Sequence, residues 1–528
     1  MPSVKLSATE LDNALSYTEA TGASDFFPMP FEIAAIRNSW ARVRPALEGV
    51  ELLSYEPKEC FEMTAPKQRC LVRPVHLPDP LDGLLYTGLT LRLAGPIETR
   101  RTQYQGEKVF SWHFNPAEVG TRDTFVSDWE KLTERLETLS TAYSYVGTSD
   151  IVDFFPRVYL HRLENSISDL SKDPLGTKAL MRFVETWSHG TSYGIPTGPR
   201  SSNFLAEALL IEVDEYLGSC DIEFVRWVDD YWIFGASEPQ VVSGLFRLGE
   251  RLNQTQGLSL NPAKTRIRTS AEFTQHVLHR DDPVADLRSQ IMDVVLEEDG
   301  PYVEVDYDSL TPDQKKAIDA LDARSTLEGA LEGDLVDLKA IKFILTFLSA
   351  FRRPDLVDLV LDNLPRLLPV GDSVAKFFDA LDDAEEASHS TIGKRILEYI
   401  GGGDFVPDFQ AMWLLDPFTK STNWNNLIEI RKLARDSKNR FVRRQAILGL
   451  RQIGDRSSLL DAKSSLDDRR DWEQRAILYA CSRLPKDEFE ALITQAGGHG
   501  GTWNMSDCLK KAVLAYMKAD TSTPAVTS

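Results

Sequence analysis

The sequence predicts an α+β domain followed by an all-α domain. Up to about residue 270, short β-prone runs such as 143–156 and 223–235 alternate with helical patterns such as 202–217, and Pro and Gly residues punctuate them. Strands and helices in that proportion are typical of an α+β fold. Beyond about residue 285 the pattern becomes almost wholly helical, so we expect one domain over 1–275 and a second over 276–528.

The all-α prediction for the second domain depends on periodicity. Apolar residues recur at spacings of three and four in 338–351 and 356–368, which is the pattern of amphipathic helices. Further on, RFVRRQAIL and DWEQRAIL share a core whose alanines, Ala446 and Ala476, lie 30 residues apart. Self-similarity at this period favours stacked helical pairs of the HEAT type, and an irregular helical bundle is the alternative.

Composition places the chain among ordinary globular proteins. It has 528 residues, of which 42% are hydrophobic and 26% are charged, which is enough for sizeable buried cores. Asp and Glu number 80 against 59 Lys and Arg, so the net charge at pH 7 is -21. This balance excludes a histone-like coat on nucleic acid, whose affinity depends on surplus Lys and Arg, but it leaves room for a narrow basic groove.

The cysteines and the apolar runs predict a cytoplasmic protein. Five cysteines are widely spread, and none forms a CxxC pair or lies at zinc-ligand spacing from a histidine. We therefore expect free thiols in a reducing compartment. The chain has no apolar run of about 18 residues, and its first residues lack the apolar core of a signal peptide, so we expect no membrane association.

One pair of acidic residues stands in an unusual setting. Of the four Asp-Asp pairs, only Asp229-Asp230, in FVRWVDDYWIF, is flanked on both sides by β-prone apolar and aromatic residues. Two acids at the tip of an apolar hairpin are costly to place unless a cation meets them. Because neighbouring side chains of a strand point to opposite faces, the two cannot be equivalent ligands without a turn between them, and we expect Asp229 to dominate.

A further carboxylate, Asp150, is expected near the end of a strand in VGTSDIVDFFP. Taken alone, either acidic segment is more simply a helix cap or a surface turn. Together, Asp150 and the Asp229-Asp230 pair would line a site with oxygen atoms for two Mg²⁺ ions, for which Mn²⁺ could substitute. Such a site can clamp the attacking and leaving oxygens of a phosphoryl transfer.

Over roughly residues 25–275 the order of these segments resembles the fingers-palm core of reverse transcriptases. DIVDFFPRVYLHRLEN is similar to the first catalytic motif, GIPTGPRSSNFLAE to the Gly-Pro template and nucleotide motif, RWVDDYWIF to the xxDD motif, and GLSLNPAKTRI to the motif after it. PFEIAAIR, the stretch from LAGPIETRR to VFSWHF and the helical second half resemble the abortive-infection and defence-associated branch of the bacterial enzymes (AbiK, AbiA and Abi-P2 types). The resemblance implies a right-hand fingers-palm core followed by a HEAT-like domain.

The resemblance also implies roles for the matching residues. The catalytic and metal-binding carboxylates would be Asp150, Asp229 and Asp230. Phe155, five residues after Asp150, takes the place of an aromatic steric gate that favours dNTPs over rNTPs, although Phe154 and Phe155 also fit a hydrophobic core. Gly198 would let the backbone approach a nucleotide.

Basic residues implied to contact the nucleotide lie in the fingers segment PKQRCLVRP, as Lys67, Arg69 and Arg73. They would clamp the triphosphate, or some of them would face the backbone of a template. Lys264 would donate a proton to the leaving pyrophosphate, or else cap a turn after Pro262. The same segments, with Arg100 and Arg101, would form the basic groove.

The function implied by the resemblance is RNA-directed DNA polymerisation in bacterial anti-phage defence by abortive infection. The enzyme would add dNTPs as a homo-oligomer, either without a template and primed from a protein hydroxyl, which leaves the DNA product covalently attached, or guided by a noncoding RNA. Three positions depart from the motifs: Thr197 replaces Gln, His113 replaces Arg, and Trp227 replaces Tyr or Phe. The changes at Thr197 and His113 motivate the alternative, a catalytically degenerate adaptor that acts through the helical-repeat domain.

Overall fold

The computed structural model describes residues 2–519 with several gaps. The gaps are residues 69–70, 105, 279–283, 285–310, 320, 334–335, 350–352, 382–385, 404, 496–504 and 506. By their contacts the residues form two compact units. The first comprises Met1–Glu62, Val75–Arg280 and Trp503–Leu509, and the second comprises Met63–Pro74, Asp281–Thr502 and Lys510–Ser528. The domain boundary predicted after residue 275 stays a prediction.

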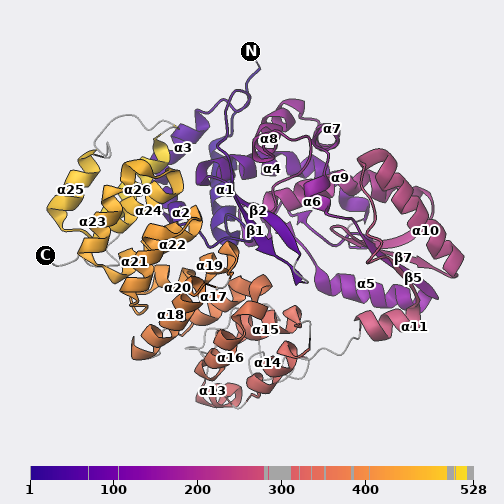
Figure 1. Cartoon of the computed structure of the whole chain (residues 1–528). Coiled ribbons are helices and arrows are strands. Elements are labelled where there is room, and N and C mark those ends of the chain that lie inside the picture. The colour runs from indigo at the N-terminus through magenta and orange to yellow at the C-terminus, as the bar shows by residue number, and fades with distance from the viewer. Residues whose placement is uncertain are drawn as a thin grey trace. The chain divides into compact units, whose positions relative to one another are not determined.

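The first half of the chain mixes helices with short strands (Figure 1). In chain order its elements are α1 (Ala8–Thr21), α2 (Phe31–Asn38), α3 (Trp40–Glu48), β1 (Phe61–Pro66), β2 (Val72–Leu77), α4 (Pro80–Arg101), β3 (His113–Phe114), β4 (Phe125–Val126), α5 (Trp129–Ala142), β5 (Tyr145–Asp150), α6 (Phe154–Arg157), α7 (Leu160–Ser171), α8 (Pro174–Trp187), α9 (Arg200–Ser219), β6 (Glu223–Trp227), β7 (Asp230–Gly235), α10 (Glu238–Arg251), β8 (Arg266–Thr269) and α11 (Ser270–Phe273). This mixture confirms the predicted α+β class for the first half.

A four-stranded antiparallel sheet in the order β6-β7-β5-β8 lies within the first unit. Side chains along each strand alternate between its two faces. Val146 of β5 and Phe234 of β7 share one face, where they join a buried cluster. The leucines of α5 in this cluster are Leu132, Leu136 and Leu139. Helix α10 also packs against β5 and β7 (Figure 1), so both α5 and α10 cover this sheet.

Gly147 sets the distance between β5 and α10. A Cβ atom at this position would lie 2.6 Å from Val241 Cγ1 and 2.8 Å from Leu245 Cδ1, two side chains of α10. Only a residue without a side chain lets the helix approach the strand this closely. The approach holds the strand whose last residue is Asp150.

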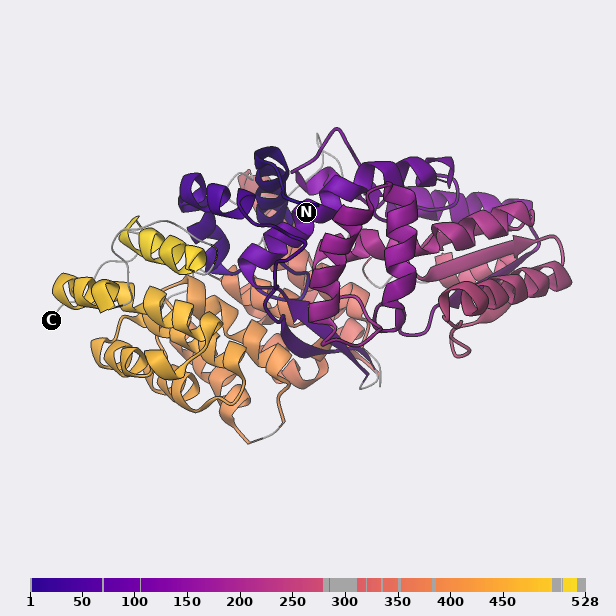
Figure 2. The ribbon, with the colours of Figure 1, turned by 90° about the horizontal axis from the view of Figure 1, so that it is seen from above.

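The second half of the chain is a stack of helices, orange to yellow in Figure 2. They are α13 (Pro312–Asp319), α14 (Ala323–Leu331), α15 (Leu338–Ser349), α16 (Val357–Asp362), α17 (Gly371–Asp379), α18 (Glu386–Gly401), α19 (Asp408–Leu414), α20 (Asp416–Lys420), α21 (Leu427–Asp436), α22 (Arg440–Ile453), α23 (Arg456–Ser464), α24 (Asp471–Ala480), α25 (Lys486–Gln495) and α26 (Cys508–Ala519). The prediction of a helical second half is confirmed for the described residues.

The two segments that share a sequence pattern form α22 and α24. Their alanines, Ala446 and Ala476, are fully buried, and α22 packs against both α21 and α24. Small buried side chains allow helices to approach closely. The assignment of these helices to the HEAT type stays a prediction.

Among the helices of the described residues, none is long and apolar enough to cross a membrane. Four cysteines are free thiols, as predicted: Cys60, Cys220, Cys481 and Cys508. Cys70 lies outside the described residues.

Candidate functional site

Strands β5 and β7 bring two of the predicted carboxylates together. In their antiparallel register Asp150, the last residue of β5, lies directly opposite Asp230, the first residue of β7. Directly opposite side chains project from the same face, with Cβ atoms about 4.5–5.5 Å apart. Like charges in such a pair repel each other, so a cation nearby is needed to stabilise them.

Asp229 lies in the two-residue turn between β6 and β7, next to Val228. Val228 has φ 53°, a left-handed conformation that is unusual for a β-branched residue. The Asp229 carbonyl accepts a hydrogen bond from the Ile151 N–H at 3.1 Å, which ties the turn to the residue after Asp150. The predicted hairpin is therefore present, and all three predicted carboxylates gather at one end of the sheet.

Lys264 brings a positive charge to these carboxylates. Its Nζ atom lies 2.5 Å from Asp150 Oδ2. Its backbone N–H donates to the Asn261 carbonyl at 3.1 Å, while the Asn261 N–H donates to the Asp150 carbonyl at 2.8 Å. Lys264 thus lies in a turn and also reaches the end of β5.

The charges at this end of the sheet are coupled. Burial raises the pKa of Asp229 and the negative charge of Asp150 raises it further, whereas the ammonium group of Lys264 lowers it. Partial burial lowers the pKa of Lys264, but the hydrogen bond to Asp150 and the negative charge of Asp150 raise it. The negative charges of Asp230 and Asp229 raise this pKa further, so that it lies above its ordinary value. One ammonium group therefore interacts with all three carboxylates.

The donor set fits a hard divalent cation. Asp150 is 5% exposed, and its Oδ1 atom is buried without a hydrogen-bond partner, which costs about 1–3 kcal/mol unless a ligand satisfies it. Mg²⁺ and Mn²⁺ prefer carboxylate oxygens, so Asp150, Asp229 and Asp230 would hold such an ion. The three carboxylates lie at the same end of the sheet, but within the described parts of the chain no three His, Cys, Asp or Glu side chains converge closely enough to form a complete metal site. The Lys264 ammonium lies against Asp150 instead.

Phe155 and Gly198 have packing partners of their own. Phe154 is buried, and the half-buried ring of Phe155 lies 5.7 Å from it in an edge-to-face arrangement. Gly198 has φ 131°, and a Cβ there would lie 2.7 Å from the His76 carbonyl oxygen and still closer to Ser24 Oγ. Close backbone packing therefore explains the glycine, and its contact with a nucleotide and the gate role of Phe155 stay predictions.

The three basic residues of the fingers segment are not all described. Lys67 and Arg73 belong to the second unit. Arg69 lies outside the described residues. Their contact with a triphosphate stays a prediction.

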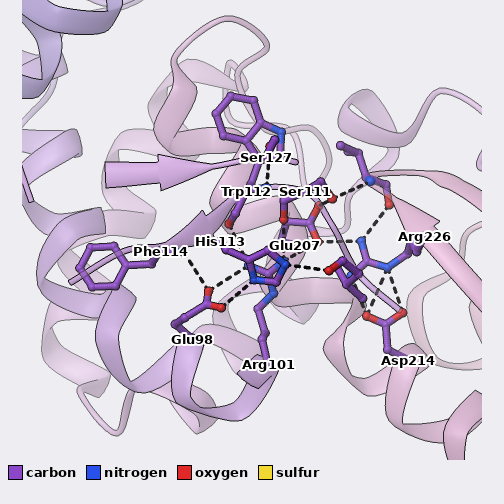
Figure 3. A network of polar contacts seen from close by, with 12 residues as sticks. Glu98, Arg101, Ser111, Trp112, His113, Phe114, Ser127, Glu207, Asp214 and Arg226 are labelled. Atoms are coloured by element: carbon purple, nitrogen blue, oxygen red, sulfur yellow. Dashed lines mark hydrogen bonds and ion pairs between the residues drawn. The ribbon is translucent and has the colours of Figure 1, made fainter. Parts of the chain in front are cut away.

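Arg101 belongs to a buried network of charges (Figure 3). Its side chain is 2% exposed, and its guanidinium donates to Glu98 and Glu207 at 3.1 Å each. The prediction that Arg101 faces nucleic acid is wrong, because its charge is engaged inside the protein. In the same network Arg226 of β6 donates to Glu207 at 2.7 Å and to Asp214 at 2.6 Å.

The sequence patterns above did not predict this network, although two features of the sequence point to it. Arg226 is the single charged residue in the apolar run FVRWV. Glu207 and Asp214 lie seven residues apart, which puts them on one face of α9, a helix whose buried residues are mostly apolar. Buried charges in such surroundings need charged partners.

Comparisons with known proteins leave the family open. No protein-family model matches the chain, and no curated protein matches it. A structure of telomerase from Candida albicans with the TWJ fragment of telomeric RNA is similar in part, with 9% sequence identity, a TM-score of 0.32 and coverage of 67% of this chain and 65% of that chain. A structure of apo telomerase from Candida tropicalis has 11% identity, a TM-score of 0.32 and coverage of 81% and 68%. The chain thus spans slightly less than two thirds of the first of these structures.

Proposed function

We propose that the chain is a reverse-transcriptase-type DNA polymerase, which transfers nucleotides from dNTPs to an acceptor hydroxyl. The observation that carries this proposal is the meeting of Asp150, Asp229 and Asp230 with Lys264 at one end of an antiparallel sheet. Carboxylates that hold metal ions, with a basic group beside them, are the residue types that phosphoryl transfer uses.

The chain's own residues would divide the reaction between them. Asp150, Asp229 and Asp230 would hold Mg²⁺ or Mn²⁺, which when bound neutralises the phosphates and activates the attacking hydroxyl. The acceptor hydroxyl loses its proton to solvent water as its oxygen bonds to the α-phosphorus, and the bond from that phosphorus to the pyrophosphate oxygen breaks. Lys264 would give its proton to the departing pyrophosphate.

Substrate binding is proposed for residues outside this group of carboxylates, on the basis of the motif resemblance. The aromatic ring of Phe155 would exclude the ribose 2′-hydroxyl, and Gly198 would let the backbone approach the nucleotide. The basic side chains that would clamp the triphosphate are Lys67, Arg69 and Arg73.

The wider function that we propose is anti-phage defence by abortive infection in the bacterial cytoplasm, with the chain acting as a homo-oligomer. The resemblance of the motifs and of the helical second half supports this. Synthesis would be either untemplated and primed from a protein hydroxyl, or guided by a noncoding RNA. Deep sequencing of nucleic acid that co-purifies with the chain, with mass spectrometry of any DNA-protein adduct, separates these two modes.

Incorporation of radiolabelled dNTPs in the presence of Mg²⁺ or Mn²⁺ tests the proposed activity. Wild type should incorporate label, and Asp229→Ala should lose at least about 100-fold, because a metal-binding carboxylate is removed. Asp467→Ala, which changes an exposed member of another Asp-Asp pair, is the matched control and should behave as wild type. Equal signals from wild type and Asp229→Ala, or no signal from either, would overturn the proposal. If Asp229→Ala also protected cells from phage as well as wild type does, the adaptor alternative would be favoured.

A further inference from the structure

The turn that carries Asp229 has an unfavourable backbone conformation. Val228 has φ 53°, and a residue other than glycine in such a conformation costs about 1–3 kcal/mol and persists only where its surroundings determine it. Both backbone groups of Val228 are held by side chains. Its N–H donates to Ser111 Oγ at 2.9 Å, and its carbonyl accepts from Arg226 Nη1 at 2.9 Å.

Ser111 and Arg226 are joined through a single carboxylate (Figure 3). Ser111 Oγ donates to Glu207 Oε1 at 2.6 Å, and Arg226 Nη1 donates to Glu207 Oε2 at 2.7 Å. Asp214 accepts further hydrogen bonds from Arg226 Nε and Nη2. Because Arg226 and Glu207 are fully buried, water does not compete for these hydrogen bonds.

The network also fixes a second residue with positive φ. Trp112 has φ 51°, and its carbonyl accepts from Arg101 Nη1 at 2.8 Å while its N–H donates to Ser127 Oγ at 2.8 Å. Arg101 Nη2 donates to the Ser111 carbonyl at 2.8 Å. The serine that holds Val228 is therefore itself held in place by a buried guanidinium.

His113 extends the network to the backbone of Val109. Its Nδ1 lies 2.8 Å from Glu98 Oε1, and its Nε2 lies 2.9 Å from the Val109 carbonyl oxygen. The imidazole ring is therefore held between a carboxylate and a backbone carbonyl. The guanidinium groups of Arg101 and Arg226 pair with the carboxylates of Glu98, Glu207 and Asp214.

Stability alone does not explain so many buried charges. Replacing a buried ion pair with apolar residues of similar volume is often neutral, or stabilises a protein by about 1–4 kcal/mol. Hydrogen bonds from the network to the Val228 backbone instead fix the geometry next to Asp229. That geometry matters for a reaction, because a misplacement of about 1 Å can lower a rate about 100-fold.

We propose that this network is a positioning device for the Asp229 carboxylate, with Ser111 and Arg226 acting through the backbone of Val228. The inference rests on the proposed function for the identity of the cation that Asp229 would bind. Ser111 and Arg226 are positioning residues, so their loss should misplace the carboxylate rather than remove it.

Ser111→Ala tests the proposal with the smallest change, because it deletes the acceptor of the Val228 N–H and the donor to Glu207. Ser171→Ala is the matched control. Ser171 is also buried, and its Oγ accepts the Asp173 N–H at 3.2 Å and lies 3.5 Å from Thr177 Oγ1. Both variants should lose a similar free energy of unfolding, about 1–3 kcal/mol.

Titration of the full-length protein with Mn²⁺, followed by electron paramagnetic resonance, measures the cation site without requiring turnover. Ser111→Ala should bind Mn²⁺ about tenfold more weakly than wild type, whereas Ser171→Ala should bind it as wild type does. Arg226→Lys keeps the positive charge but loses the planar guanidinium with its several N–H donors. This variant should also bind Mn²⁺ more weakly than wild type. In dNTP incorporation, Ser111→Ala should lower kcat about tenfold or more while KM changes by less than about twofold.

Two results would overturn the positioning role, whether or not wild type polymerises. One is an Mn²⁺ affinity in Ser111→Ala and Arg226→Lys equal to that of wild type. The other is an equal loss of affinity in Ser111→Ala and Ser171→Ala. If Mn²⁺ affinity depends on Ser111 but wild type incorporates no dNTP, the positioning role stands and the proposed polymerase function fails.

Discussion

Lys264 contributes little to stability, although we propose a central role for it in the reaction. Its side chain is 63% exposed, although its ammonium lies against Asp150. Ion pairs that reach solvent contribute only about 0–1 kcal/mol to stability. Stability therefore does not account for the position of Lys264 beside three carboxylates, whereas the proposed proton-donor role does.

Lys264→Gln should slow dNTP incorporation about 100-fold or more, because an amide cannot give a proton to the leaving pyrophosphate. The free energy of unfolding should change by less than about 1 kcal/mol. Lys131→Gln is the matched control, since Lys131 is also exposed and pairs with Asp128 at 2.8 Å, and it should keep the wild-type rate. Single-turnover incorporation measures both variants, and a wild-type rate for Lys264→Gln would contradict the proton-donor role.

Glu98 makes the buried network sensitive to pH. Burial opposes its ionisation, but the hydrogen bond from His113 and the charge of Arg101 hold the pKa of Glu98 below its ordinary value of 4.5. A carboxylate whose pKa is lowered by folding stabilises the folded state above its unfolded pKa, and this stabilisation disappears as the pH falls. Glu98→Gln should therefore lower the free energy of unfolding by about 1–3 kcal/mol near neutral pH, and by progressively less below about pH 4.5.

Urea unfolding of wild type and Glu98→Gln across this pH range measures the difference. If the difference between the two proteins stayed constant down to about pH 3, the ionised carboxylate would not be the stabilising group.

Among the elements of the fold, strand β5 and the β6–β7 hairpin place the site. Asp150 ends β5, and Asp230 begins β7 in direct register with it. The close packing of β5 against α10 depends on the absence of a side chain at Gly147. A change at this strand is therefore expected to affect both stability and the position of Asp150.

Gly147→Ala should lower the free energy of unfolding by about 1–3 kcal/mol, because the new methyl group meets Val241 and Leu245 in a packed interface. Gly95→Ala is the matched control, since a Cβ at Gly95 in α4 has no atom within 4 Å. This control should be neutral or should stabilise the protein by about 1 kcal/mol. Denaturant unfolding measures the free energy of unfolding of both variants. A wild-type value for Gly147→Ala would contradict the close packing of β5 against α10.

The local elements of the site could be predicted from the sequence, whereas its long-range contacts could not. The strand that ends at Asp150 and the hairpin at Asp229 follow from apolar runs and turn positions, which are local signals. The hydrogen bond between Ser111 and Val228 joins residues 117 positions apart, and no local pattern reports such a contact. The same limit applies to Gly198, whose close packing against His76 depends on a strand far away in the sequence.

For the whole chain, the net charge of -21 restricts how nucleic acid can be bound. Affinity for the phosphate backbone depends on Lys and Arg that can reach it. Arg101 and Arg226 are buried in ion pairs, so they are not available for this purpose. To hold a strand, the protein would then need a local arrangement of other basic side chains.

The full-length chain should therefore bind a short duplex DNA weakly, with a Kd above about 1 µM at about 0.15 M salt. Fluorescence anisotropy with a labelled duplex, repeated over a range of salt concentrations, measures this affinity. Nanomolar binding that persists at high salt would show that the acidic surface does not limit the interaction.

The proposed role of the three carboxylates in nucleotide transfer is tested most directly by the rate of labelled dNTP incorporation in Asp150→Asn. This substitution keeps the shape of the side chain that faces Asp230 and Lys264 but removes its charge. Wild type should incorporate dNTPs with Mg²⁺ or Mn²⁺, and Asp150→Asn should be slower by about 1,000-fold or more while it unfolds at a similar denaturant concentration. A wild-type rate for Asp150→Asn, or no incorporation by wild type, would contradict the proposed catalytic site.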